Sequence, residues 1–185
     1  MQRTLVLVKP DGVYRALIGK VISQIEDTGL RVIAMKMVWA DRKIAAVHYA
    51  DDPEWYKATG AKTLQNYKDR GVKTNKTAEQ LARGVREMLI KFISSGPVVA
   101  MVVEGESAIS VTRKLVGATE PRKAEPYTIR GRYCSDSYEA ANELQRPILN
   151  IVHASEDTKT ADREIELWFK KTEIFDYKRA DEKFV

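Results

Sequence analysis

Apolar residues follow two repeats along this chain, one typical of strands and one typical of helices. The continuous apolar run at residues 98–103 has the length and composition of a buried strand. Val21, Ile22 and Ile25 recur at helical spacing, and Gly29 follows them as a helix terminator. The strands predicted from such runs are residues 3–9, 30–39, 97–104 and 148–152. The predicted helices are residues 19–27, 41–49, 78–93, 107–116 and 158–170.

The order of these elements predicts an α+β fold in a single domain, residues 1–185. Residues 51–76 are polar and weakly periodic, and we expect a partly helical surface excursion there. Without the short second helix, the remaining order contains a split β-α-β pattern. Such a pattern gives a four-stranded antiparallel sheet with helices on one face. Residues 117–131, with Pro121 and Pro126, are predicted to form a long loop.

Composition adds a folded, soluble class with a small preference for anionic partners. The net charge is +5 and the pI about 9.2, so nucleotides and nucleic acids both suit the chain. Cys134 is the one cysteine, which excludes an intrachain disulfide, and no cysteine- or histidine-rich cluster indicates a metal site. We expect a cytoplasmic protein without a membrane partner, because neither a signal peptide nor a membrane-spanning apolar run is visible.

Two residues late in the chain indicate nucleophilic chemistry. His153 ends the last predicted strand and precedes a helix start, where backbone amides favour anions. Glu164 lies one helical turn from both Ala161 and Trp168, beside the apolar stripe of the last helix, where a carboxylate needs a partner. A histidine oriented by a carboxylate can act as a nucleophile. Each residue alone also fits an ordinary role, a core or surface histidine and a rim glutamate; the pair favours function.

Cations at two other places could bind phosphate. Lys9 ends the first apolar strand just before the turn at residues 10–12, so a rigid strand would aim its amine. Arg113 precedes the loop at 117–131 and Arg130 lies inside it, and arginines around such a loop could clamp a polyphosphate. The alternative is a snorkelling lysine and ordinary surface arginines.

Seven segments together resemble the nucleoside diphosphate kinase family. They are RTLVLVKPDGV at 3–13, HY at 48–49, SGPVVAMV at 95–102, RKLVGAT at 113–119, TIRG at 128–131, NIVHAS at 150–155 and REI at 163–165. These segments occur in the order of the family and span most of the chain. The resemblance implies a ferredoxin-like βαββαβ fold and an enzyme that moves phosphate between nucleoside tri- and diphosphates.

The resemblance also implies roles for the catalytic residues. His153 attacks the γ-phosphate of a triphosphate, and an acceptor diphosphate then takes the phosphate, a ping-pong scheme. Glu164 holds the imidazole in the useful tautomer, with support from Ser155. Tyr49 is expected beside His153 and Lys9.

Nucleotide contacts follow from the same resemblance. Lys9, Arg113, Thr119 and Arg130 are implied phosphate ligands. Asn150 is implied to bond the ribose. Mg²⁺ is expected to bridge phosphate oxygens and to be held chiefly by the nucleotide, without a protein metal site. Family members assemble as hexamers, tetramers or dimers, so a homo-oligomer is expected.

The chain departs from the family pattern in its loops and at the position that contacts the base of the nucleotide. Tyr127 and Arg132 replace the usual glycine and aspartate, and segments 51–83 and 133–147 are inserted. The aromatic position that stacks the base falls on Val85, with Leu89 one turn later.

We therefore expect Val85 and Leu89 to form one apolar wall for the base. Trp55 or Tyr56, in the first insert, is a hypothetical partial substitute for the missing aromatic. The alternative is that both aromatics anchor the insert to the body.

Two other functions are compatible with this order of elements. An RNA-recognition module shares this element order, but it needs aromatics on two strands, and residues 4–8 and 98–103 contain none. A non-catalytic family member is disfavoured because no expected catalytic residue is missing. Nucleic acid is therefore not expected as the main partner.

Overall fold

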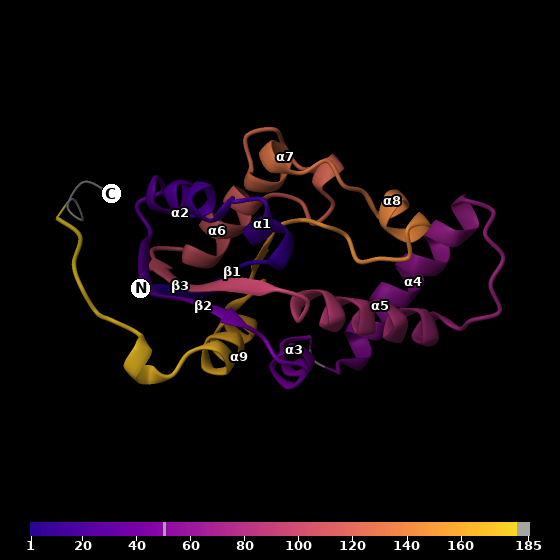
Figure 1. Cartoon of the computed structure of the whole chain (residues 1–185), viewed down its shortest axis with the longest axis horizontal. Coiled ribbons are helices and arrows are strands. Elements are labelled where there is room, and N and C mark those ends of the chain that lie inside the picture. Colours follow the sequence, from indigo (N-terminus) through magenta and orange to yellow (C-terminus); the bar gives the residue numbers. More distant parts are fainter. Residues whose placement is uncertain (50, 181–185) are drawn as a thin grey trace.

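A four-stranded antiparallel sheet forms the centre of the protein, as a computed structural model of residues 1–49 and 51–180 shows (Figure 1). Its strand order is β2-β3-β1-β4, all neighbours antiparallel. The strands are β1 (Gln2–Val8), β2 (Arg31–Trp39), β3 (Pro97–Gly105) and β4 (Val152–Ala154). The predicted α+β, ferredoxin-like class is confirmed. Ala50 and residues 181–185 of the predicted domain lie outside the described residues.

Nine α-helices and two short 3₁₀ helices occupy the described residues. The helices before the third strand are α1 (Pro10–Tyr14), α2 (Ile18–Glu26), α3 (Arg42–His48), α4 (Pro53–Asp69) and α5 (Ala78–Ile93). Those after it are α6 (Ala108–Val116), α7 (Ile129–Tyr133), α8 (Tyr138–Glu143) and α9 (Thr158–Trp168). The 3₁₀ helices are η1 (Pro121–Lys123) and η2 (Lys171–Glu173). The predicted loop at 117–131 is therefore partly helical.

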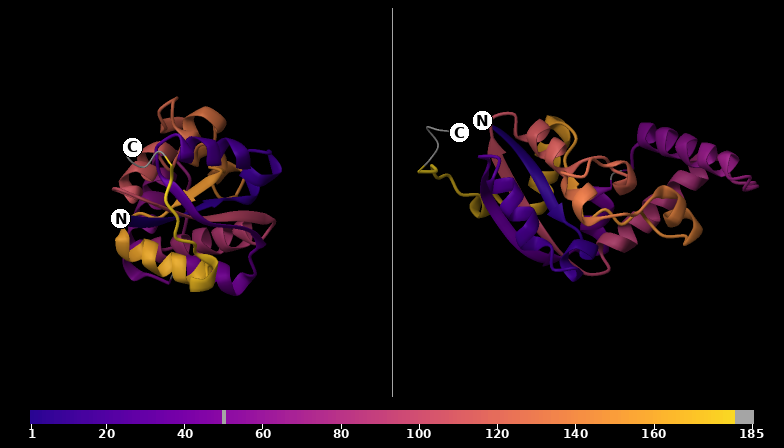
Figure 2. Two further views of the ribbon diagram at one scale, coloured as in Figure 1. Left: turned by 90° about the vertical axis from the view of Figure 1, so that its left-hand side faces the viewer. Right: turned by 90° about the horizontal axis from the view of Figure 1, so that it is seen from above.

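Helices cover both faces of the sheet, which corrects the expectation of one covered face. Leu5 and Leu7 of β1 point into a core with α3, α5 and α9, whereas Val6 and Val8 point into a second core with α2 and α6. Figure 1 and the left view of Figure 2 show the strands between these two layers. The near-continuous apolar runs of β1 and β3 have this cause, because a strand buried on both faces loses the alternation of apolar and polar residues.

The last strand is shorter and later than predicted. Residues 148–152 read as a strand, but Ile151 has a φ of 53°, in the left-handed region that extended backbone does not use. The Ile151 carbonyl accepts from Lys9 N (2.8 Å), and Ile151 N donates to the Asp11 carboxylate (3.0 Å). This turn ties the start of β4 to the end of β1, so His153 comes to lie beside Leu7 in the sheet.

The inserted segments form a helical extension beyond the end of the sheet (right view of Figure 2). The first insert, predicted to be only partly helical, contains the 17-residue helix α4, which packs on α5. Gly60 of α4 lies so close to the backbone of Ala78 that a β-carbon there would collide with it. The second insert contributes α8. None of the described helices is long and apolar enough to cross a membrane.

Candidate active site

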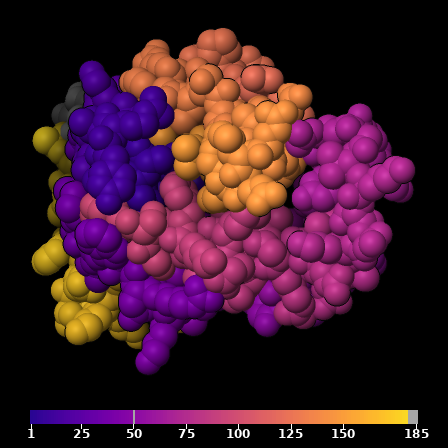
Figure 3. All heavy atoms as spheres, turned by 45° about the vertical axis from the view of Figure 1, so that its right-hand side comes forward, coloured from indigo at the N-terminus to yellow at the C-terminus, as the bar shows by residue number. Residues whose placement is uncertain are grey.

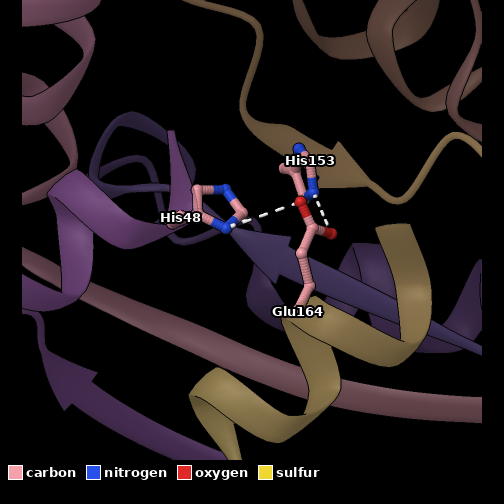
Figure 4. Close-up of side chains that lie close together, drawn as sticks. All are labelled: His48, His153 and Glu164. Atoms are coloured by element: carbon pink, nitrogen blue, oxygen red, sulfur yellow. Dashed lines mark hydrogen bonds and ion pairs between the residues drawn. The ribbon is translucent and has the colours of Figure 1, made fainter. Parts of the chain in front are cut away.

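His153 and Glu164 lie side by side, as the sequence predicted for this pair (Figure 4). The His153 Nε2 atom is 2.9 Å from Glu164 Oε2. The β4 strand presents His153 at the end of the sheet with its side chain 25% exposed, whereas α9 buries Glu164 to 2%. With the Nε2 proton directed at the carboxylate, Nδ1 is the ring nitrogen that keeps a lone pair for chemistry.

Glu164 is held as a carboxylate by several polar neighbours. Ser155 Oγ donates to Glu164 Oε2 (2.6 Å), and an Arg163 guanidinium nitrogen lies 3.7 Å from Oε1. Burial favours the neutral acid, but the charge and hydrogen bond of His153 outweigh it and hold the pKa of Glu164 at about 2. The carboxylate is therefore charged at neutral pH, and the hydrogen bond from Ser155 also lowers the pKa of Glu164.

His48, whose sequence context indicated no particular role, is a third member of this cluster. It ends α3 and is buried, with Nδ1 3.6 Å from Glu164 Oε1 and accepting from Trp168 Nε1 (3.3 Å). Burial and the neighbouring His153, whose ring lies edge-on at 4.6 Å, lower the pKa of His48 to about 3, so it is neutral. Two sequence signals pointed to His48: its place in the apolar face of α3, after Ala45, and its membership of the HY segment at 48–49.

The ligand atoms of His48, His153 and Glu164 all lie within 4.8 Å of one another, close enough to hold a metal ion. Two imidazoles and one carboxylate suit a transition metal better than Mg²⁺, which prefers oxygen ligands. Hydrogen bonds join His153 and Ser155 to Glu164 and Trp168 to His48 Nδ1, whereas His48 Nε2 is buried without a hydrogen-bond partner among the described residues.

The Tyr49 ring packs on that of His48, which in turn packs on His153. The Tyr49 and His48 rings meet edge-on at 4.8 Å. Burial, with the charges of Glu164 and Asp11, raises the pKa of the Tyr49 hydroxyl, so the phenol stays protonated. The carbonyl of Tyr49 accepts from Arg86 Nε on α5 (2.6 Å), which fixes the end of α3.

Lys9 and Asn150 are buried in a neighbouring cluster that also contains Arg113 and Arg130. Lys9 is 5% exposed, and its Nζ donates to Asn150 Oδ1 and lies 5.5 Å from the centre of the Phe92 ring. Burial lowers the pKa of Lys9 to about 8, with a further decrease from Arg130 and an opposing effect of Asp11. Lys9 therefore carries a proton at neutral pH. Burial of this charge costs free energy, and an anionic ligand would reduce that cost.

Arg130 organises the backbone around this cluster. Its guanidinium donates to the carbonyls of Gly117 (2.8 Å), Val152 (2.8 Å) and Asn150 (3.3 Å). Burial lowers the pKa of Arg130 to about 10, which leaves it charged at neutral pH. Asn150 Nδ2 in turn donates to the Thr119 carbonyl (2.7 Å). The loop after α6 and the start of β4 are thus joined through these side chains.

Arg113 and Thr119 are exposed at the rim of the same cluster. The charge of Arg113 adds to the burial that lowers the pKa of Arg130, so these guanidinium groups lie within electrostatic reach of each other. Positive charge is therefore concentrated at Lys9, Arg113 and Arg130. His153 lies near this charge, because its strand β4 pairs with β1, the strand that ends just before Lys9.

The residues expected at the base separate into two groups. Val85 and Leu89 are half-buried one turn apart on α5. Tyr56 is only 4% exposed and lies under the Arg83 guanidinium, 4.7 Å from its ring centre. Trp55 meets the edge of Tyr56 at 5.5 Å. The Tyr56–Arg83 contact joins α4 to α5, which supports an anchoring role for Tyr56 and leaves its ring no open face for a base, whereas the Trp55–Tyr56 contact lies within α4.

Comparisons with known proteins identify the family of this chain. The family model described as nucleoside diphosphate kinase matches residues 2–59 and 78–174. The chain belongs to the nucleoside diphosphate kinase family. It is 39% identical over 182 residues to a nucleoside diphosphate kinase of Pyrobaculum aerophilum, covering 95% of this chain and 99% of that protein. The family resemblance seen in the sequence is confirmed.

Solved structures of family members have the same fold. The crystal structure of an NDP kinase from Pyrobaculum aerophilum superposes with a TM-score of 0.91 at 38% identity, over 95% of this chain and 99% of that chain. A structure of the Borrelia burgdorferi enzyme with bound vanadate and ADP, described as a transition state mimic, has a TM-score of 0.80 at 42% identity. The match covers 98% of this chain and 94% of that chain. Like these relatives, the chain is an enzyme that transfers phosphate.

Proposed function

We propose that this enzyme transfers the terminal phosphate of a nucleoside triphosphate to a nucleoside diphosphate through a phosphohistidine at His153. The observation that carries the proposal is the pairing of His153 Nε2 with the buried Glu164 carboxylate. This pairing leaves Nδ1 unprotonated on a ring that is partly exposed beside a cluster of cations. A nucleophile, an orienting carboxylate and charges for the phosphates are the parts that such a transfer needs.

In the first half-reaction, the Nδ1 lone pair attacks the γ-phosphorus. The bond from that phosphorus to the bridging oxygen breaks, and the diphosphate leaves with its electron pair. Because Nε2 keeps its proton, the phosphorylated ring is cationic, and Glu164 stabilises that charge. In the second half-reaction, a terminal oxygen of an acceptor diphosphate attacks the same phosphorus and the P–N bond breaks, which restores His153.

We assign the phosphates to Lys9, Arg113, Thr119 and Arg130, and the ribose to Asn150. The concentration of positive charge at Lys9 and Arg130, each buried at an energetic cost, supports the assignment. Tyr49 acts through His48, and Ser155 acts through Glu164. These are positioning roles.

The base is assigned to the apolar wall of Val85 and Leu89 on α5. Neither side chain can form a hydrogen bond with a base edge, so purine and pyrimidine, ribo and deoxyribo nucleotides should all serve.

Mg²⁺ enters as part of the nucleotide substrate. The candidate ligands His48, His153 and Glu164 do not suit a resident Mg²⁺, which fits an ion held chiefly by phosphate oxygens. When bound, the ion neutralises phosphate charge.

We also propose that the chain assembles with copies of itself. Met35, Met37 and Trp39 alternate along β2, an edge strand, and their side chains are more than half exposed. An exposed apolar row on a sheet edge is a template for pairing with another chain, and a second copy presents the same row. Light scattering after size exclusion tests this: a monomer would overturn it.

The proposed reaction is tested by initial rates of phosphate transfer from ATP to a second nucleoside diphosphate. A ping-pong mechanism predicts parallel lines in double-reciprocal plots at several acceptor concentrations. Intersecting lines would indicate direct transfer between two bound nucleotides. Absence of transfer would support the non-catalytic alternative.

A further inference from the structure

The two inserted segments contact each other through polar side chains on α4 and α8. Asn142 Nδ2 on α8 donates to Asn66 Oδ1 on α4 at 2.8 Å. At the residue that follows α4, an Arg70 guanidinium nitrogen lies 3.3 Å from Glu143 Oε1. Figure 3 shows the surfaces of α8 (light orange) and α4 (magenta) meeting beside α5. Residues 60–77, which include Asn66 and Arg70, fall outside the match to the family model.

At its own base, α8 is attached to the phosphate side of the active site. Tyr138 N donates to Glu120 Oε1 (3.2 Å), next to Thr119 in the chain. The Asp136 carbonyl accepts from Arg122 N (3.1 Å). The Asp136 carboxylate accepts from Leu149 N (2.7 Å), the residue before Asn150. These hydrogen bonds connect the start of α8 to the loop that carries Thr119 and to the turn that carries Asn150.

At the opposite side, α4 is attached to the helix assigned to the base. Gly60 allows its backbone to approach Ala78 at the start of α5, and Tyr56 packs under Arg83. From α5, Arg86 donates to the carbonyls of Ala46 (2.8 Å) and Tyr49 (2.6 Å). The α4–α5 pair is thus fixed at one end to α3, and its contact with α8 is a second support.

We propose that four residues, Asn66, Arg70, Asn142 and Glu143, are positioning residues that hold α5 at a fixed distance from the loop that carries Thr119. This inference rests on the proposed nucleotide site. The contact completes a ring that runs from α5 through α4, α8 and the loop at 117–128 to Asn150 and Lys9, which lies on Phe92 of α5. A preformed gap lowers the conformational entropy lost when a nucleotide bridges the base wall and the loop that carries Thr119. The contact between α4 and α8 therefore raises nucleotide affinity and does not change the rate of the chemical step.

A pair of aspartates tests the contact with matched controls in the same positions. Asn66→Asp keeps the acceptor for Asn142, and Asn142→Asp can accept from the Asn66 amide after it rotates, so each single variant retains a hydrogen bond. The double variant N66D/N142D sets two carboxylates against each other and separates the helices. We expect KM for ADP to rise about tenfold in the double variant, more than the product of the two single effects, with kcat unchanged.

The Arg70–Glu143 pair provides an independent test if the double variant folds poorly. R70E places two carboxylates together and should raise KM, whereas R70E/E143R restores the pair in reverse and should restore KM. An unchanged or lower KM in N66D/N142D, or a lower melting temperature without a change in KM, would overturn the proposal. If the unmodified enzyme transfers no phosphate at all, that result would instead refute the proposed function.

Discussion

Replacing Glu164 by glutamine tests how much the carboxylate contributes to transfer. The Glu164→Gln change keeps the size of the side chain and an oxygen that can accept from His153 Nε2, but it removes the charge. The hydrogen bond at 2.9 Å loses its charge assistance, which is worth about 1–2 kcal/mol. The attraction between a carboxylate and the cationic phosphorylated ring, about 4 kcal/mol at an effective dielectric constant of about 20, sets the upper limit.

These magnitudes predict that the rate of phosphoenzyme formation falls by at least about fivefold to thirtyfold, with an upper limit of about a thousandfold. The assay is single-turnover quenched flow with labelled ATP at saturating concentration. Because glutamine still orients the ring, transfer should be slowed and not abolished. Nucleotide affinity, measured by calorimetry, should stay within about twofold of the parent value, because Glu164 contacts no proposed nucleotide ligand.

Glu166→Gln provides the matched control, since Glu166 lies two residues away on α9 and is exposed. It makes the same chemical change and the same change in net charge. If the two variants transfer phosphate at the same rate, Glu164 is only a buried structural carboxylate and the proposed orientation is wrong.

Three further results are expected. Because the pKa of His48 is about 3 in the folded protein, the unfolded chain takes up the proton first, and folding stability should fall by about 2 kcal/mol between pH 7 and 5. Urea unfolding of His48→Asn should show a smaller decrease, and an equal one would contradict this account. Because the pKa of Lys9 is about 8, KM for nucleotides should rise above pH 8, and a flat profile to pH 9.5 would count against a phosphate role. Steady-state kinetics should show use of purine and pyrimidine, ribo and deoxyribo diphosphates; strict selection of one base would refute the Val85–Leu89 wall.

Sequence patterns predicted the central strands and the proximity of His153 and Glu164 for physical reasons. The apolar runs of β1 and β3 are long because helices cover both faces of the sheet. Glu164 was conspicuous because it interrupts an otherwise apolar helical face, and the structure shows that His153 and Ser155 are its partners.

Other features depend on contacts that no local pattern encodes. The left-handed Ile151 shortened the last strand, because tertiary bonds to Lys9 and Asp11 favour a turn over an extended backbone. Helix α4 has weak periodicity because its main support is α5, so only a narrow stripe is buried. His48 is buried through Trp168 and Glu164, residues more than 100 positions away.

The most direct test of the account is chemical analysis of the enzyme after incubation with γ-labelled ATP and Mg²⁺ without an acceptor. We predict one alkali-stable, acid-labile phosphate on His153, which is released as product when a nucleoside diphosphate is added. His153→Ala should lose both the label and turnover. A labelled His153→Ala protein, or phosphate found on another residue, would contradict the central claim.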